Sequence, residues 1–536
     1  MTLLASIDRC GLADLAGLFK WYNPAVTSPT RQITRAAGTV MLAFVASRIL
    51  GLLREIVIGA RFGTSAELDA YLAAFRLTDL LYQLVAGGAL GSAFIPTFAR
   101  YLAAQNQSGA WRLASAVINI VTLILIVAAA LAALFAPLLV ATLIAPGFDA
   151  ATQALTVSLM RVMLLAPVIF GASGILMGAL NAQQHFLLPA LAPIMYNLAI
   201  IGGTLFLAPT LGTGGLAIGV VAGAAGHLLI QLLGLARFGA RYFPVFDVRD
   251  PGVRQIARLM GPRVLGLAVV QINFLINTNL ASRLGEGAVS ALNYAWLLML
   301  LPQGVFAQSI ATAAFPTFAA QAARSQIDAM RRTLSGALRA TLFLSLPAAV
   351  GLIVLRLPLV QVLLQRAEFT ADSTQAVAYT LQFFALGLAA HSVLEIVTRA
   401  FYALHDTRTP VFVGVAAMGL NVVLSLLLID SLAQGGLALA NSIATTLETL
   451  ALVWLLRPRL HGIEGGRVWN AFLRSGLSAA AMGLTLFGLL QLPIDSALLL
   501  GLGGMIVGGL VYGGVALLLR VEELNRVIQI VRKRKT

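Results

Sequence analysis

The feature that most constrains this chain is the recurrence of long apolar stretches. Segments of the roughly 20 residues needed to cross a bilayer follow one another from residue 36 to residue 519, separated by short stretches that carry Gly, Pro and charge. The sequence is 59% hydrophobic and only 11% charged, and its mean hydropathy is +0.90. A soluble domain with a polar surface does not have this balance. The sequence therefore predicts a multi-pass integral membrane protein.

The polar residues between the apolar stretches divide them into about fourteen transmembrane segments. They lie near 36–60, 67–99, 113–145, 155–180, 187–208, 214–236, 262–282, 288–320, 336–357, 374–403, 409–430, 435–456, 469–492 and 495–519. Runs of this length without period-two alternation exclude strands, so an all-α bundle is the architecture that satisfies the backbone. The longest polar connections, 237–258 and 321–335, are too short to fold as a soluble catalytic domain.

The distribution of basic residues predicts the orientation in the membrane. The chain has 36 Lys and Arg against 21 Asp and Glu, a net charge of +15. With the segments above, one side receives Arg61, Arg283, Arg356 and Arg366, and the other side receives the remaining basic residues of the connections and both termini. This asymmetry follows the positive-inside rule and places both termini in the cytoplasm. The basic charge is therefore assigned to topology and to contact with membrane lipids, and no nucleic-acid partner is predicted.

The sequence contains no pattern typical of a catalytic or metal centre. Its one cysteine, Cys10, excludes a disulfide framework and a cysteine-based metal cluster. There is no Walker A motif, no zinc motif and no Ser or Cys nucleophile setting, so ATP hydrolysis is not expected to drive the protein. We therefore predict no cofactor, no metal and no catalytic residue. The chain is expected to be a non-enzymatic protein that moves a substrate through or across the bilayer.

The two halves of the chain are related by an internal repeat with an offset of about 221 residues, as between Phe148 and Phe369. The matching pairs, in order, are Arg61-Phe-Gly63 with Arg283-Leu-Gly285, Phe94-Ile-Pro96-Thr97-Phe98 with Ala314-Phe315-Pro316-Thr317-Phe318, Pro189 with Pro410, Asn197 with Asn421, and Gly214-Gly215-Leu216-Ala217 with Gly435-Gly436-Leu437-Ala438. Each unit holds six segments, an even number, so both insert the same way up. Parallel repeats of this kind are typical of transporters that bind substrate between two lobes near the bilayer midplane.

The repeat predicts the domain organisation. We expect an N-terminal cytoplasmic extension at 1–35 and a six-helix lobe at 36–240, followed by a cytoplasmic linker at 241–258. We then expect a second six-helix lobe at 259–458, two additional transmembrane helices at 459–519 and a basic cytoplasmic tail at 520–536. The fold class is thus two parallel six-helix pseudo-repeat lobes with two C-terminal helices.

Ionisable residues inside the first two segments are candidates for substrate binding. A charge at the centre of a membrane helix is costly, by about 2.5–3.5 kcal/mol for Arg on insertion scales, so it normally faces a wet cavity or a partner. Arg48, Arg54, Asp69 and Arg76 have no charged counterparts in the second unit. One interpretation is a cationic cavity for an anionic group such as a phosphate. The alternative is internal ion pairing, of Arg54 with Glu55 and of Arg76 with a nearby aspartate.

Two further groups of intramembrane charges lie in the second unit. Glu395 precedes Arg399 by four residues, the favoured order for an ion pair on one helix face. This pair is either a structural lock or part of an ion relay. Glu448 has no cation close in sequence, so it is either a site for a coupling ion or a partner of a cation on another helix.

The first two segments also contain a dense run of motifs shared with a known family. The motifs are Ser47-Arg48-Ile-Leu-Gly51-Leu-Leu-Arg54, Arg61-Phe-Gly63, Asp69-Ala70, Ala74-Phe75-Arg76 and Ala93-Phe94-Ile-Pro96, with Ala145-Pro146-Gly147-Phe148 and Met260-Gly261-Pro262 further on. They resemble the MviN/MurJ lipid II flippases of the multidrug/oligosaccharidyl-lipid/polysaccharide exporter superfamily. The match covers residues 36 to 520. At Trp296-Leu297, in the eighth segment, the chain departs from the Asp-Arg pair of Gram-negative enterobacterial members.

This resemblance implies a function and a set of partners. A member of this family moves the undecaprenyl-pyrophosphate-linked peptidoglycan precursor, lipid II, from the inner to the outer leaflet of the bacterial plasma membrane by alternating access, in cell wall biosynthesis. Arg48 and Arg54 stand where the family's essential arginines stand, Asp69 at its acidic position, and Arg76 at a usually basic one. Other cell wall synthesis proteins are implied partners. The alternatives are another undecaprenyl-linked oligosaccharide, a multidrug antiporter of the same superfamily, or a membrane-embedded transferase.

Overall fold

The computed structural model describes residues 29–85, 89–235 and 239–524, and every regular element in these ranges is a helix. The first bundle contains α2 (Pro29–Phe62), α3 (Ala66–Val85), α4 (Ala89–Ala103), α5 (Gln107–Leu134), α6 (Ala136–Leu139), α7 (Ala150–Met163), α8 (Leu165–Ala182), α9 (Leu187–Gly202), α10 (Ala208–Leu211) and α11 (Thr213–Leu235). Most of the expected extension 1–35 and of the basic tail 520–536 lies outside the described residues.

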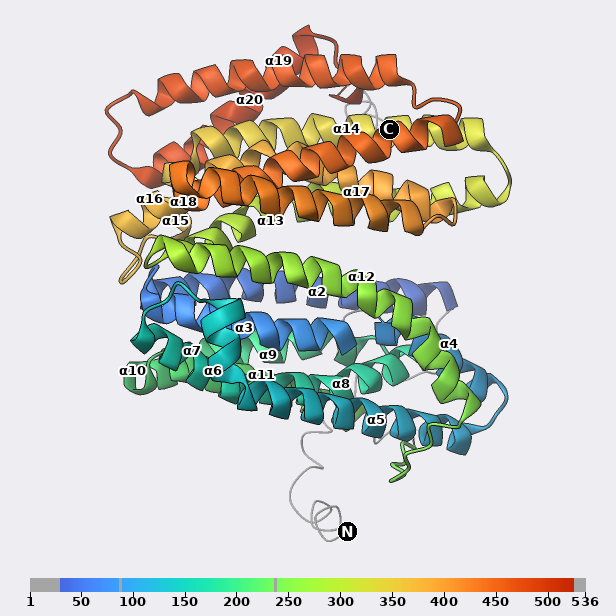
Figure 1. Cartoon of the computed structure of the whole chain (residues 1–536). Coiled ribbons are helices and arrows are strands. Elements are labelled where there is room, and N and C mark those ends of the chain that lie inside the picture. Colours follow the sequence, from blue (N-terminus) through green and yellow to red (C-terminus); the bar gives the residue numbers. More distant parts are fainter. Residues whose placement is uncertain (1–28, 86–88, 236–238, 525–536) are drawn as a thin grey trace.

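The second bundle follows an extended connection that ends where Asp250 caps the next helix. It contains α12 (Pro251–Ala281), α13 (Ala288–Ala323), α14 (Ile327–Val354), α15 (Arg356–Leu364), α16 (Ala371–Leu386), α17 (Leu388–Ala403) and α18 (Arg408–Arg459), and two more helices follow, α19 (Gly465–Leu490) and α20 (Gly504–Leu518). Figure 1 shows the two bundles side by side, with α2 and α12 between them and α19 on the outer face of the second bundle.

The helices agree with the expected all-α membrane fold. Nine helical spans in the described residues are long and apolar enough to cross a membrane, and α16 with α17, bent by 46°, makes a tenth. Helix α18 is itself two helices that meet at Ala433, where φ is 48°. Each of the fourteen predicted segments falls on a helix or a helix pair, which is consistent with about fourteen spans. The predicted segment 67–99 contains α3 and α4, and the residues between them, 86–88, lie outside the described residues.

The internal repeat is visible in the helices and explains one of its motifs. A short helix follows the third span of each unit, α6 in the first and α15 in the second, and two consecutive helices come next, α7 and α8 in the first unit and α16 and α17 in the second. A Cβ on Gly215 would lie 2.5 Å from the backbone nitrogen of Ala208, and one on Gly436 would meet the carbonyl oxygen of Leu428. The Gly-Gly motif therefore occurs twice because two helices approach backbone to backbone at equivalent places.

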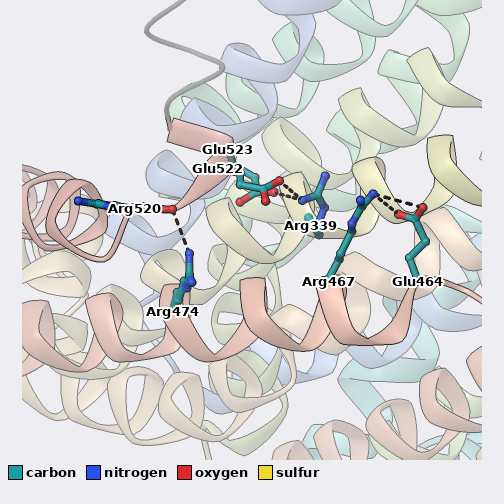
Figure 2. Close-up of polar contacts among 7 residues, drawn as sticks. All are labelled: Arg339, Glu464, Arg467, Arg474, Arg520, Glu522 and Glu523. Carbon is teal, nitrogen blue, oxygen red and sulfur yellow. Dashed lines mark hydrogen bonds and ion pairs between the residues drawn. The ribbon is translucent and has the colours of Figure 1, made fainter.

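The last two helices are held to the second bundle partly by a polar cluster at one end (Figure 2). The guanidinium of Arg339, a residue of α14 with a side chain 6% exposed, pairs with Glu522 at 2.6 Å and Glu523 at 3.3 Å, both beyond the end of α20. Arg474 of α19 donates to the carbonyl oxygen of Arg520 at 3.1 Å. These contacts join α14, α19 and the segment after α20 at their polar ends.

Candidate functional site

A large cavity lies between the two bundles. Its volume is about 1510 Å³, more than the roughly 300–1,000 Å³ of a pocket for a drug-sized ligand. One wall is formed by α3 of the first bundle, and the others come from α12, α13, α16, α17 and α18 of the second. The cavity extends from Val289, near the start of α13, to Tyr402 and Arg408 at the turn between α17 and α18. Since both of these side chains are exposed, the mouth is at this turn.

The charged residue types in the described cavity lining are two arginines and two acids: Arg76, Asp79, Arg408 and Glu448. Arg76 is the predicted site residue that reaches the cavity from the first bundle. Its Nε donates to Thr278 Oγ1 of α12 at 3.0 Å, and its guanidinium lies 5.5 Å from the centre of the Phe274 ring. Arg76 therefore bridges the two bundles and is held in place by both a hydrogen bond and a cation–π contact. Neither Asp69 nor Asp79 forms an ion pair with it.

Arg54 lies behind this wall, in a side pocket of about 150 Å³ that shares Arg76, Asp79 and Asn293 with the main cavity. Its guanidinium pairs with Glu55 at 2.5 Å and donates to Asn197 Oδ1 at 3.1 Å. Its charge is thus already compensated in this state.

Arg48 stands apart from both spaces. Its side chain is exposed, and its Nη1 lies 2.9 Å from the place where a Cβ on Gly304 of α13 would stand. The guanidinium therefore lies against α13 at the junction of the two bundles, outside the described lining of the cavity.

Asp69 lies at the opposite end of the cavity from the mouth and caps a helix of the other bundle. It is 1% exposed, and its carboxylate accepts hydrogen bonds from the backbone nitrogens of Gly287 at 2.8 Å and Ser290 at 2.7 Å. These are orphan donors of the first turn of α13, where the helix dipole also favours a negative charge. Asp69 is not among the described residues that line the cavity; its charge instead fastens the two bundles together at this end.

Two hydrogen bonds donated by backbone nitrogens complete this closed end, and their positions are equivalent under the internal repeat. The backbone nitrogen of Glu368 donates to the carbonyl oxygen of Ala60 at 3.1 Å, and the backbone nitrogen of Gly147 donates to Ser282 Oγ at 3.1 Å. Gly147 matches Glu368, and Ala60 matches Ser282, at nearly the repeat offset. The same seam includes a hydrogen bond of 2.8 Å between the hydroxyls of Thr64 and Ser373. We call this set of contacts the closed end.

The closed end depends on glycines. Gly63 has a φ of 58°, and a Cβ there would meet the carbonyl oxygen of Glu368. A Cβ on Gly147 would stand 2.5 Å from Cα of Arg283. Backbone cannot move aside as a flexible side chain can, so the bundles reach this separation because neither position has a side chain.

Near the mouth, the predicted charges of the second bundle are partly paired. Arg399 donates to Glu395 at 2.8 Å, within one face of α17. Glu448 lines the cavity from α18, with Oε1 3.3 Å from a Cβ position on Gly414, and no ion pair joins it to a cation of the described residues. Asp406 caps the start of α18, which positions Arg408 at the mouth.

Asp406 is ionised at any physiological pH. Burial acts to raise its pKa, but hydrogen bonds from Thr409 and the pairing with Arg459 outweigh this effect and lower the pKa to about 2. The charge that caps α18 is therefore present throughout the physiological pH range.

Sequence reasoning missed the polar residues that α12 contributes to the cavity. Asn273, Asn277 and Thr278 line it together with Phe274, and none of these four side chains is charged. The spacing of Asn273 and Asn277 by four residues in an otherwise apolar stretch was the available signal, since polar side chains inside a membrane helix turn away from lipid.

The chemistry of this site is binding and gating. No group of His, Cys, Asp and Glu residues suited to a metal ion occurs among the described side chains. A cavity that is fastened at one end and has its mouth at the other, between two repeat-related bundles, is the arrangement required for alternating access. The fold and the cavity thus define a two-lobed membrane transporter.

Comparison with known proteins identifies the family. The profile of the family described as lipid II flippase MurJ matches residues 58–495. The probable lipid II flippase MurJ of Rhizobium meliloti is 32% identical over 496 residues, covering 90% of this chain and 92% of the relative. The lipid II flippase MurJ of Burkholderia cenocepacia is 31% identical over 433 residues, covering 79% and 84%. The chain belongs to the MurJ family, which confirms the resemblance inferred from the sequence.

Solved structures agree with this assignment. A lipid II flippase MurJ in an inward closed conformation superposes with a TM-score of 0.77 at 27% identity, covering 91% of this chain and 99% of that one. An inward-facing multidrug resistance MATE family transporter of the MOP superfamily superposes with a TM-score of 0.66 at 17% identity, covering 78% and 96%. At that identity the second likeness shows the shared fold alone.

Proposed function

We propose that this chain moves lipid II from the inner to the outer leaflet of a bacterial plasma membrane, as a non-enzymatic flippase in cell wall biosynthesis. The observation that carries the proposal is the cavity between the lobes, closed at the Asp69 end, in a member of the MurJ family. The two other transport functions considered from the sequence, a different undecaprenyl-linked oligosaccharide and a multidrug antiporter, are not favoured by the family match.

The proposed orientation puts the mouth of the cavity on the cytoplasmic side. Arg408 at the mouth belongs to the strongly basic side of the chain, which the positive-inside rule assigns to the cytoplasm, and both termini lie on this side. The closed end then faces outward. Labelling of single cysteines in a Cys10→Ser background tests this: a cysteine at Arg249, in the connection between the lobes, should be protected from a membrane-impermeant maleimide in whole cells. Labelling of that cysteine from outside would reverse the orientation.

In the proposed mechanism the two lobes, 36–240 and 259–458, move around the bound lipid. The outer end between them opens while the inner end closes. Arg76 is the first-lobe cation that meets the pyrophosphate, because it is the described arginine on the first-lobe wall of the cavity. Arg54 adds its charge from the adjoining side pocket if its pairing with Glu55 loosens. Arg48 lies at the junction with α13 and Asp69 at the closed end, and both affect the equilibrium between the inward-open and outward-open states.

Three residues of the second lobe have proposed roles near the mouth. Glu395 and Arg399 are a structural pair that fixes α17, and Glu448 is the candidate acid for a coupling ion because it lines the cavity without an ion pair among the described cations. Other cell wall synthesis proteins, which would supply or use the substrate, are proposed partners.

Depletion and complementation test the proposed function. When the chain is depleted in its host, lipid II should accumulate on the inner leaflet, and the wild-type gene should restore its movement. Arg76→Ala and Arg54→Ala should fail to restore it while inserting normally, whereas Arg112→Ala, which removes an exposed arginine of α5 outside the cavity, should restore it fully. Unchanged lipid II distribution after depletion would refute the function. Full rescue by the double Arg54→Ala, Arg76→Ala protein would refute the cationic site alone.

A further inference from the structure

The wall of the cavity that belongs to the second lobe has a different chemistry from the wall of the first. Five asparagines line it: Asn273 and Asn277 from α12, Asn293 from α13, and Asn421 and Asn441 from α18. Each amide offers an acceptor oxygen and two donor hydrogens. A pyrophosphate has only acceptor atoms, so it would use no amide oxygen of this wall. The wall suits a neutral ligand that both donates and accepts.

The hydrogen bonds within this wall are incomplete. Asn277 Nδ2 donates to Asn273 Oδ1 at 2.9 Å, and Asn273 Nδ2 donates to Asn421 Oδ1 at 3.3 Å. Asn277 Oδ1 and Asn421 Nδ2 are then left without a partner although both atoms are buried, and Asn421 as a whole is only 2% exposed. Buried polar atoms are nearly always paired. A structural role, with one bond within α12 and one between α12 and α18, explains both bonds but leaves one acceptor and one donor unused.

An aromatic ring in a fixed orientation lies on the same wall. Trp296 lines the cavity from α13 and contacts three other rings edge to face: Phe274 at 6.0 Å, Phe384 at 5.3 Å and His391 at 5.5 Å between centroids. His391 is itself fixed by a hydrogen bond of 3.0 Å between its Nε2 and Asn441 Oδ1. The face of an indole ring is electron-rich and attracts the polarised C–H groups of a sugar ring, as it attracts the positive edge of another aromatic ring.

We propose that this wall is the subsite for the uncharged glycan of the lipid-linked substrate, with Trp296 packing against a sugar ring and Asn277 and Asn421 bonding to its hydroxyl or acetamide groups. Arg76, which reaches from α3 to Thr278 and Phe274 at the edge of this wall, then holds the charged pyrophosphate. The cavity of about 1510 Å³ has room for both parts at once. The inference rests on the proposed function, because it divides that substrate between the two lobes.

Binding of two probes to the full chain in lipid nanodiscs tests the proposal. One probe is undecaprenyl pyrophosphate without sugar, and the other is the same lipid carrying an N-acetylated disaccharide without peptide. Wild-type protein should bind the glycan-bearing probe at least about tenfold more tightly, which corresponds to 1.4 kcal/mol. Trp296→Leu and Asn277→Leu should each remove most of this preference and leave the affinity for the bare probe within about twofold. Arg76→Gln should weaken both probes.

Matched controls separate packing from recognition. Trp454→Leu removes a tryptophan of α18 that is 70% exposed and does not line the cavity, so it should leave the preference intact. Trp296→Phe keeps an aromatic ring against the same neighbours and should retain part of the preference. If Trp296→Leu does not fold, the ratio of the affinities of Trp296→Phe for the two probes tests the role of Trp296. This ratio is independent of any general loss of active protein.

The outcomes distinguish the inference from the function on which it rests. If wild-type protein binds neither probe, the proposed function fails. If it binds both equally, or if the Trp296 and Asn277 variants weaken both probes by the same factor, the function stands and the glycan subsite is refuted. A preference for the glycan that the two variants abolish, with normal binding of the bare lipid, supports the subsite.

Discussion

Replacement of Asp69 by Asn should open the closed end. The carboxylate of Asp69 is buried and accepts two backbone hydrogen bonds, of 2.8 Å from Gly287 and 2.7 Å from Ser290, across the junction of the lobes. Asn has one oxygen in place of two, so at least one of the two backbone donors loses its acceptor and instead faces an NH₂ group. The substitution changes no volume and leaves the rest of α3 intact. Its effect should therefore fall on the contact between the lobes.

The magnitude follows from the bonds that are lost. A hydrogen bond to a charged group contributes about 1.5–3 kcal/mol, and a negative charge at a helix N-terminus contributes about 0.3–2 kcal/mol. Loss of one bond and of the charge should therefore cost the closed state about 2–5 kcal/mol. At 1.4 kcal/mol for each factor of ten, the equilibrium between the closed and the open arrangement of this end should shift by roughly 30- to 4,000-fold.

Labelling of a cysteine at Thr64 measures this shift. The Thr64 hydroxyl contacts Ser373 of the other lobe at 2.8 Å, so a thiol there should react with a polar maleimide mainly when the end opens. In a Cys10→Ser background, Asp69→Asn should raise the labelling rate of Thr64→Cys in proportion to the open fraction. Asp149→Asn is the matched control, because Asp149 also caps a helix, α7, through Ala151 of its own lobe. An unchanged rate with Asp69→Asn would refute the fastening role.

Three further outcomes are expected in the same cysteine-free background. Gly147→Ala places a Cβ 2.5 Å from Cα of Arg283, so it should block closure and raise the maleimide labelling of Thr64→Cys; normal protection would show that the lobes can separate slightly without opening. The pair Thr64→Cys and Ser373→Cys should cross-link on mild oxidation and stop transport until a reductant is added, since the hydroxyls are 2.8 Å apart; transport by the cross-linked protein would exclude opening at this end. Arg339→Met removes a cation whose side chain is 6% exposed and which pairs with two carboxylates. The free energy of unfolding, measured by thermal unfolding in detergent, should fall by about 1–3 kcal/mol, less than the full value for a buried pair because one carboxylate is 60% exposed. An unchanged transition would show that apolar packing alone holds the last two helices.

The sequence predicted the helices and the repeat well because both depend on local periodicity and on the length of apolar runs. It could not predict which part of the structure each residue of one helix face contacts. Asp69 and Arg76 share one face of α3 and were grouped as cavity residues, but seven residues span about 10.5 Å of helix. That distance separates the closed end, where Asp69 meets α13, from the cavity, where Arg76 meets α12.

Partners that lie far apart in the sequence were also beyond its reach. The pairing of Arg54 with Glu55 was foreseen as an alternative because the two are adjacent, whereas its bond to Asn197 joins residues 143 positions apart. The amides of α12 carry no charge, so the pattern of intramembrane charges does not include them. Their spacing was visible, but their proximity to Asn421 and Trp296 depends on how α12, α13 and α18 pack.

The repeat has been kept in one part of the molecule and lost in another, and the two parts differ in what they must do. At the closed end, Glu368 bonds to Ala60 and Gly147 bonds to Ser282, so each lobe supplies the same backbone donor and its partner supplies an acceptor at the equivalent place. Among the described residues, the Asp69 and Thr64 contacts at the same end have no counterpart in the repeat, so the symmetry there is confined to these two hydrogen bonds. In the cavity the described first-lobe wall has Arg76 where the second lobe has amides and Trp296. A ligand that is charged in one part and neutral in another gains nothing from symmetric walls, so the divergence of the cavity walls follows from binding an asymmetric lipid-linked substrate.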